Sequence, residues 1–145
     1  MYKNILVPVD LNEESFADKA LEQAQALAAT MGAEIHLLNV LPGIHMSMVA
    51  SYFPQEAAQQ MKADVKIQLE KFAAKYITEN VNYHLHIEEG KPYTTILKQS
   101  AKINADLIII PSHKRSRLDK VMLGSVAAKV VENSPINVMV IKPQG

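Results

Sequence analysis

The sequence predicts an α/β protein with an open, doubly wound sheet of five parallel strands and helices on both faces. Two observations carry this prediction: short apolar runs alternate with amphipathic segments of helical period, and no repeat or linker interrupts the 145 residues. Helical crossovers force the strands to run parallel, and such crossovers are right-handed almost without exception. We therefore expect a single domain over residues 1–145.

The first elements are a strand, a helix and a second strand. Residues 5–9 (Ile-Leu-Val-Pro-Val) form a continuous apolar run, typical of a strand buried on both faces. Asn12 is expected to cap a helix with apolar residues at helical spacing as far as Met31, and Gly32 to end it in a left-handed conformation. Residues 35–40 (Ile-His-Leu-Leu-Asn-Val) are the second predicted strand.

The middle of the chain predicts a loop, a long helix and an edge strand. Residues 44–53 show no clear period, and we expect a loop there. Apolar residues then recur every three or four positions over 58–76, which indicates an amphipathic helix. Residues 81–87 alternate between polar and apolar, as in a strand with one wetter face.

The last elements are helix, strand, helix and strand. Pro92 suits the first position of the third helix, and residues 106–110 (Asp-Leu-Ile-Ile-Ile) are the fourth strand. Gly124 and Ser125 open the fourth helix, and residues 137–141 form the fifth strand. Together these elements complete the predicted order β-α-β-α-β-α-β-α-β.

Composition excludes several classes of function. Fifteen basic residues balance fifteen acidic ones, so no global charge attracts nucleic acid or an anionic membrane. The absence of cysteine excludes disulfides, thiolate metal sites and a cysteine nucleophile. No apolar run approaches the roughly 18 residues of a membrane span, and the first residues do not resemble a signal peptide. We expect a cytoplasmic protein.

The segments after the first and fourth strands could form a ligand site. Ligands of doubly wound sheets bind beyond the carboxyl ends of the strands, where the winding reverses. The first strand ends in Pro8-Val9-Asp10, and residues 114–120 carry four basic side chains against one acidic one. Gly124 and Ser125 then begin a helix, whose free N–H groups favour an anion.

These motifs, taken in order, resemble the universal stress protein family. They are Pro-x-Asp at 8–10, Ser-His at 112–113, the basic stretch, Leu-Gly-Ser-Val-Ala at 123–127 and Pro-x-x-Val-x-Val at 135–140. The resemblance covers essentially the whole chain. It implies a strand order of 3-2-1-4-5, in which the first and fourth strands are neighbours.

The resemblance also implies a binding site for ATP, with or without Mg²⁺. ATP-binding members carry Gly-x₂-Gly-x₉-Gly-Ser/Thr; here Gly124-Ser125 matches the last part, whereas Pro111 and Lys114 occupy the two earlier glycine positions. By this resemblance Asp10 and Val40 contact adenine or ribose. The implied binding residues are Pro8, Val9, Asp10, Val40, Pro111, Ser112, His113, Lys114, Arg115, Gly124, Ser125 and Val126.

Three functions follow as hypotheses. The first is a nucleotide-binding stress-response or regulatory protein with no assigned catalytic residue and at most slow hydrolysis, because no catalytic base or Walker-type metal pair is visible. The second is a dimeric interaction protein that has lost the ligand, as the two missing glycines suggest. The third is an enzyme or electron-transfer module of the flavodoxin-like kind. It would need a phosphate loop after the first strand, where residues 11–14 (Leu-Asn-Glu-Glu) are acidic.

The remaining histidines suggest packing rather than chemistry. His84 and His86 share one strand face, but no third metal ligand is evident, so we predict no metal site. His36 alternates with apolar residues and is expected to be a satisfied histidine near the core. His113 is expected to anchor its loop or to contact phosphate rather than to act as a base.

The fifth strand predicts a homodimer. It is apolar on both faces and lies at the edge of the predicted sheet, and such edges pair readily with another chain. Family members commonly dimerise through this strand, so the resemblance implies the same here, besides an unidentified protein partner. The strand residues concerned are Val138, Met139, Val140 and Ile141.

Overall fold

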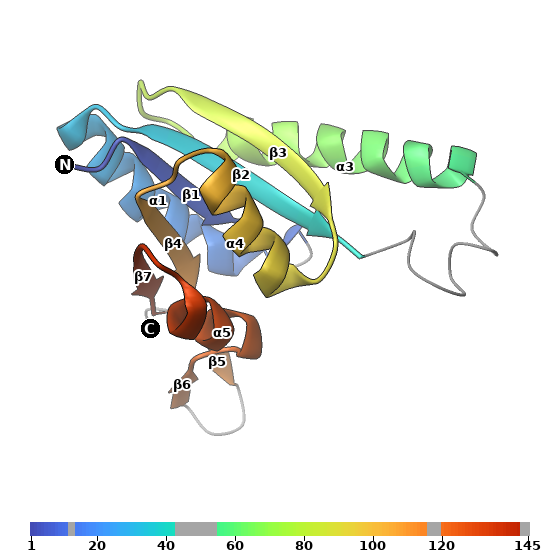
Figure 1. Cartoon of the computed structure of the whole chain (residues 1–145). Helices are drawn as coiled ribbons and strands as arrows, with labels where there is room; N and C mark the ends of the chain where they lie inside the picture. Colours follow the sequence, from blue (N-terminus) through green and yellow to red (C-terminus); the bar gives the residue numbers. More distant parts are fainter. Residues whose placement is uncertain (12–13, 43–54, 116–119, 143–145) are drawn as a thin grey trace.

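A computed structural model describes residues 1–11, 14–42, 55–115 and 120–142 of the chain. Its centre is a five-stranded parallel sheet with the order β3-β2-β1-β4-β7, which confirms the predicted fold class and strand order (Figure 1). The winding reverses between β1 and β4, so these two strands lie side by side. The strands are β1 (Asn4–Pro8), β2 (Glu34–Leu41), β3 (Tyr83–Glu89), β4 (Leu107–Pro111) and β7 (Asn137–Ile141).

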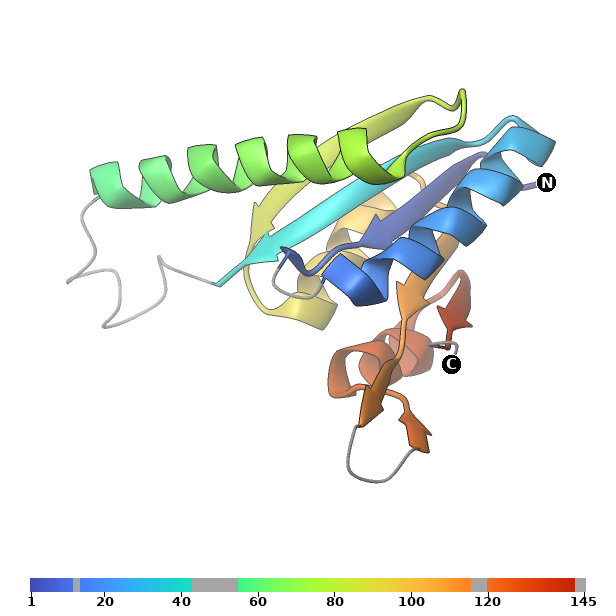
Figure 2. The same cartoon turned by 180° about the vertical axis from the view of Figure 1, so that it is seen from behind.

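Helices cover both faces of the sheet. α1 (Glu14–Met31) and α3 (Gln55–Tyr76) lie on one face, where Figure 2 shows them in front of the strands. α4 (Pro92–Lys102) and α5 (Ser125–Asn133) lie on the other face. Pro92 stands at the start of α4, as predicted. None of the described helices is long and apolar enough to cross a membrane.

The strands form two hydrophobic cores because successive side chains point to opposite faces. Ile5 and Val7 of β1 pack with α1 and α3, where Leu69 and Phe72 are fully or almost fully buried. Leu6, between them in sequence, packs on the other face with residues of α4 and α5. The central strands are thus buried on both faces, as their continuous apolar runs predict.

Two glycines have backbone conformations that other residues rarely adopt. Gly32 ends α1 with φ = 70°, as predicted, and its N–H donates to the Ala28 carbonyl. Gly90 lies between β3 and α4 with φ = 143°, and a methyl group there would lie 2.6 Å from Thr95 Oγ1. Gly90 therefore permits the tight approach of β3 to α4.

One region differs from the sequence prediction. The basic stretch after β4 contains a two-stranded antiparallel sheet of β5 (His113–Arg115) and β6 (Lys120–Met122). Lys114 pairs with Val121 at the centre of this hairpin. The pairing gives the backbone hydrogen-bond partners beyond the end of the main sheet. The predicted cap Asn12 and the loop expected at 44–53 lie outside the described residues.

Candidate functional site

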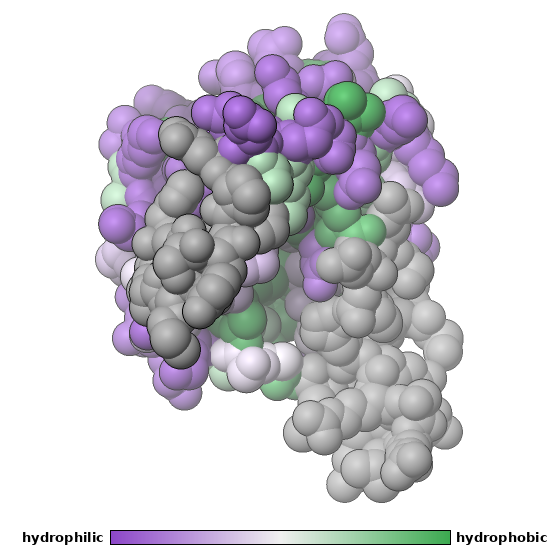
Figure 3. All heavy atoms as spheres, turned by 90° about the vertical axis from the view of Figure 1, so that its right-hand side faces the viewer, coloured by the Kyte–Doolittle hydropathy of each residue, from purple (hydrophilic) through white to green (hydrophobic). Residues whose placement is uncertain are grey.

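A cavity of about 590 Å³ opens at the carboxyl ends of the strands, where the winding reverses. Figure 3 faces this end of the molecule and shows a hollow with a largely hydrophobic floor. The structure brings eight of the twelve implied binding residues to this cavity. They are Pro8, Val9, Asp10, Val40, Pro111, Gly124, Ser125 and Val126.

The wall formed by β1 and β2 is held by two hydrogen bonds. The Val9 N–H donates to the Leu38 carbonyl at 2.8 Å, which extends the ladder beyond the end of β1. Asn39 Nδ2 donates to the Val9 carbonyl at 3.0 Å, and the Asn39 side chain is only 9% exposed. These bonds fix the segment that presents Asp10 to the cavity.

The amino terminus of α5 forms another wall of the cavity. Gly124 is the N-cap residue in an extended conformation, and it has no side chain to accept from the first N–H groups. The first helical hydrogen bond runs from the Ala128 N–H to the Gly124 carbonyl at 2.9 Å. The N–H groups of the first turn, which precede it, therefore have no intrahelical acceptor, and Ser125 and Val126 line the cavity.

Ser112 does not line the cavity. It is 2% exposed, and its N–H and Oγ both donate to the Ile141 carbonyl of β7, at 2.9 and 3.3 Å. Its backbone N–H is therefore engaged in the sheet. His113, Lys114 and Arg115 belong to β5, and their side chains lie outside the described part of the structure.

Several lining residues escaped the sequence prediction. Val65 and Gln68 reach the cavity from α3, and Pro92 and Ile96 reach it from α4. Val65 belongs to the apolar stripe of α3, which predicts burial but not a place in a cavity. It lines the cavity because of the way α3 lies across the sheet. Asn39 was detectable in principle, because it precedes Val40 at the carboxyl end of β2.

The cavity combines apolar walls with few charges. Among the described lining residues, Asp10 alone carries a charged side chain. The other polar contributions are the Asn39 and Gln68 amides, Ser125 and the positive end of the α5 dipole. Such a site can enclose a flat apolar group, accept hydrogen bonds at Asp10 and hold an anion at α5.

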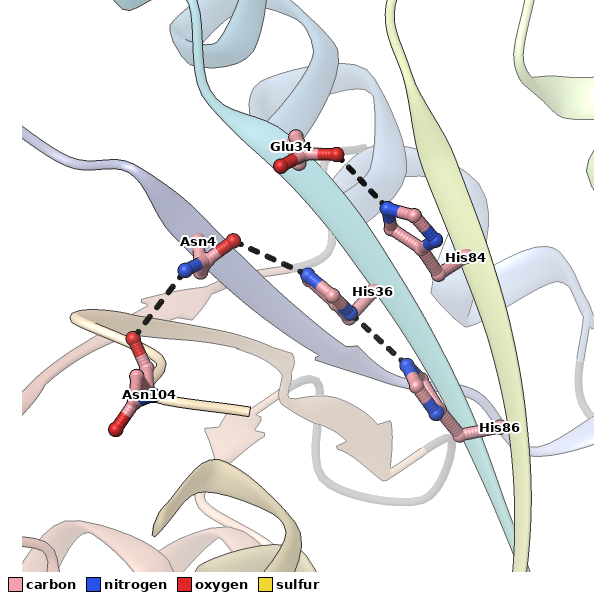
Figure 4. A network of polar contacts seen from close by, with 6 residues as sticks. All are labelled: Asn4, Glu34, His36, His84, His86 and Asn104. Atoms are coloured by element: carbon pink, nitrogen blue, oxygen red, sulfur yellow. Dashed lines mark hydrogen bonds and ion pairs between the residues drawn. The ribbon is translucent and has the colours of Figure 1, made fainter. Parts of the chain in front are cut away.

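The predicted histidine pair is part of a separate network. His84 and His86 of β3 flank His36 of β2, with ring centroids 4.7 and 5.1 Å from that of His36 (Figure 4). His36 is 8% exposed and hydrogen-bonded, which confirms the prediction of a satisfied histidine. Among the described side chains, no group of three or more His, Cys, Asp or Glu has the arrangement of a metal site.

Known proteins resemble this chain both in sequence and in fold. The model of the universal stress protein family matches residues 1–142. Universal stress protein G of Salmonella typhimurium is 29% identical over 145 residues, which cover 98% of this chain and 100% of that protein. The solved structure of MJ0577, a universal stress protein of Methanocaldococcus jannaschii, aligns with a TM-score of 0.80 at 28% identity, over 100% of this chain and 99% of that chain.

Two further solved structures share the fold and contain nucleotides. One is a universal stress protein in complex with cAMP, with a TM-score of 0.70 at 17% identity over 97% of both chains. The other is a universal stress protein from Archaeoglobus fulgidus in complex with dAMP, with a TM-score of 0.71 at 22% identity, over 97% of this chain and 98% of that one. The family match, the relatives and the strand order agree, and the chain belongs to the universal stress protein family.

Proposed function

We propose that the protein binds an adenine nucleotide, with ATP as its ligand, in the cavity at the carboxyl ends of the strands. The observation that carries this proposal is that Asp10 and the uncapped amino terminus of α5 line one and the same largely apolar cavity. Its volume of about 590 Å³ lies within the usual range for small-molecule sites.

Each wall suits one part of such a ligand. The base and ribose would lie against Val9, Asp10 and Val40, where Asp10 accepts hydrogen bonds from ribose or base and apolar side chains cover the ring. The phosphates would lie at Ser125 and Val126, where backbone N–H groups and the helix dipole stabilise negative charge.

The relatives support the same class of ligand. The proteins of this fold solved with cAMP and with dAMP both hold an adenine nucleotide. For this chain we propose ATP, with Mg²⁺ bound to its phosphates and at most slow hydrolysis, because Asp10 is the sole carboxylate among the described lining residues. A nucleotide ligand and a chain without cysteine both favour a cytoplasmic location.

The backbone at the end of β4 favours a second function, that of an interaction protein without a nucleotide. Pro111 has no N–H, and the Ser112 N–H is donated to the Ile141 carbonyl, so neither supplies a phosphate donor. If α5 does not compensate for this, the protein is a dimeric interaction module that keeps the fold without the ligand.

The experiment that separates the two functions starts from freshly purified protein. The protein is denatured, and any released small molecule is identified by mass spectrometry. Stripped protein is then titrated with Mg-ATP and, as a control, with Mg-GTP by calorimetry. Release of an adenine nucleotide, or heat with ATP well above that with GTP, supports the first function. No release together with no heat at millimolar ATP supports the second.

We also propose a homodimer formed through β7. This strand lies at the edge of the sheet, and its apolar residues from Val138 to Ile141 remain only half buried in the monomer. Val140→Lys should shift the mass measured by light scattering toward the monomer. Val131→Lys, at a 43% exposed valine of α5, is the matched control and should leave the mass unchanged. A folded Val140→Lys protein with the wild-type mass would contradict the proposed interface.

A further inference from the structure

Three histidines gather on the neighbouring strands β2 and β3 (Figure 4), on the face of the sheet that α4 covers. His36 and His84 lie near the amino ends of their strands, and none of the three lines the cavity. His36 lies between His84 and His86, with interplanar angles of 22° and 19°. His36 Nδ1 and His86 Nε2 are 2.9 Å apart, and this contact joins β2 to β3. The proposed nucleotide site uses none of these side chains.

The hydrogen bonds define where the protons lie. Asn4 Nδ2 donates to the Asn104 carbonyl at 3.4 Å, so Asn4 Oδ1 remains to accept from His36 Nε2 at 3.2 Å. His36 is then protonated on Nε2, and its Nδ1 accepts from the N–H at His86 Nε2. When both rings are charged, both facing nitrogens become donors, and the bond between the strands is lost.

The surrounding charges come from three elements. Glu34 of β2 accepts a hydrogen bond from His84 Nε2 at 2.8 Å. Glu88 of β3 and Lys102 of α4 approach each other to 3.9 Å, and both act on His86. From β1, Asn4 contributes an amide without charge, and its backbone N–H donates to Asp106 Oδ1 at 3.1 Å. Glu34 thus pairs with His84, whereas the two described hydrogen bonds of the His36 ring join it to another imidazole and to an amide.

β3 is an edge strand, and the His36–His86 contact adds a side-chain bond to the backbone ladder that joins it to β2. In the described structure it pairs only with β2, and its residues are exposed or half buried. We propose that His36, His84 and His86 form a proton-sensitive latch, which holds β3 to the sheet at neutral pH and releases it in acid. The latch is a regulatory device separate from the cavity and independent of nucleotide binding.

The direction of the pH effect follows from the proton affinities of the closed and open forms. Burial, together with the neighbouring His84 and His86, lowers the pKa of His36 from 6.5 to about 4. Burial and His84 also lower the pKa of His86. In the open form both rings regain their ordinary pKa, so the open form binds more protons once the pH falls below about 6.5. The closed form is therefore fully favoured above that pH and loses this advantage as the pH falls toward 4.

Hydrogen exchange of the β3 amides tests the latch in the whole protein. Protection factors, corrected for the intrinsic exchange rate, are compared at pH 7.5 and pH 5. The shift of His36 alone allows the opening equilibrium constant of β3 to rise about thirtyfold at most over this range. We expect β3 to lose about tenfold in protection, and the buried amides of β4 to lose less.

The variants separate titration from packing. His36→Gln combined with His86→Gln keeps amide groups that can hydrogen-bond but cannot titrate, and it should remove the extra loss of protection in β3. His113→Gln removes a histidine of the β5–β6 hairpin and should leave the loss unchanged. An equal loss in the double variant and in the wild type would overturn the latch.

A second measurement on the wild-type protein keeps the test decisive if the double variant folds poorly. The ring protons of each histidine are followed by NMR from pH 7.5 to pH 4. The latch predicts that His36 stays neutral until well below pH 6. Titration of His36 near pH 6.5 with unchanged protection of β3 would overturn it.

Discussion

The two ends of the sheet use polar groups differently. At the carboxyl ends, Asp10 and the first turn of α5 face an open cavity. At the amino ends, His36 is bonded to His86 and Asn4, and the stacked rings leave little space between them. The first arrangement lines a cavity with polar groups, whereas the second bonds its polar groups to one another within the protein.

The difference shows why residue type alone does not identify a site. Histidines are common in catalytic and metal sites, yet His36, His84 and His86 bond to groups of the protein itself and do not line the cavity. The cavity is lined mostly by apolar residues and backbone groups, and its polar side chains are few. Position at the topological switch point, rather than chemical reactivity, distinguishes the candidate binding site.

The largest expected effect is at the amino terminus of α5. Ser125→Glu places a carboxylate where the phosphates would lie, and repulsion should lower nucleotide affinity at least about 100-fold, measured by calorimetry. The fold should be retained, because an acidic residue is favourable at a helix amino terminus. Thr94→Glu adds the same charge to the first turn of α4 outside the cavity and should change affinity little. Equal losses in both variants would show that the charge acts nonspecifically.

The next largest effect, on stability, is expected at Gly90, which connects β3 to α4. Gly90 follows the histidine-bearing strand and leads into α4, whose Pro92 lines the cavity. Gly90→Ala should lower the free energy of unfolding by about 2–3 kcal/mol. An alanine is strained at φ = 143°, and its methyl group would meet the Thr95 side chain.

Gly32→Ala is the control for that change, measured by the same urea unfolding. Gly32 has φ = 70°, and a methyl group there meets nothing within 4 Å, so the loss should be about 1 kcal/mol. If Gly32→Ala destabilises the protein as much as Gly90→Ala, the contact with Thr95 does not contribute to the effect.

A smaller effect is expected at the wall of the cavity. Asn39→Leu removes the hydrogen bond to the Val9 carbonyl and leaves that acceptor without its partner, at a cost of about 1–2 kcal/mol in stability. Because the bond positions the segment before Asp10, nucleotide affinity should also fall several-fold. Asn137→Leu removes an exposed hydrogen bond to Tyr2 and should change neither quantity appreciably. Unchanged nucleotide affinity in a stable Asn39→Leu protein would show that the Asn39 amide does not position the binding site.

The sequence predicted the fold because periodicity and topology were consistent along the chain. The buried runs of β1 and β4 and the alternation in β3 each reflect how much of the strand is covered. The β5–β6 hairpin was not predicted, because each of its strands has only three residues, too few to show a hydrophobic period. The two strands pair where the chain runs beyond the end of β4, and no hydrophobic pattern in the sequence marks this pairing.

The candidate site was predictable where it follows the backbone of the strands and of α5. Motifs bring Asp10, Val40 and Ser125 together through the strand order alone. The contributions of Gln68 and Ile96 could not be derived, because they depend on how the helices lie over the sheet. Ser112 illustrates the reverse case, since its motif suggests a ligand contact but its N–H is donated to β7.

The most direct test of the central claim is an amide NMR titration of the full chain with Mg-ATP. Nucleotide binding in the cavity should give saturable shifts at Asp10, Val40, Ser125 and Val126 and leave His84 and His86 unaffected. Shifts confined to the histidine end of the sheet, or no saturable shifts at millimolar ATP, would contradict nucleotide binding in this cavity.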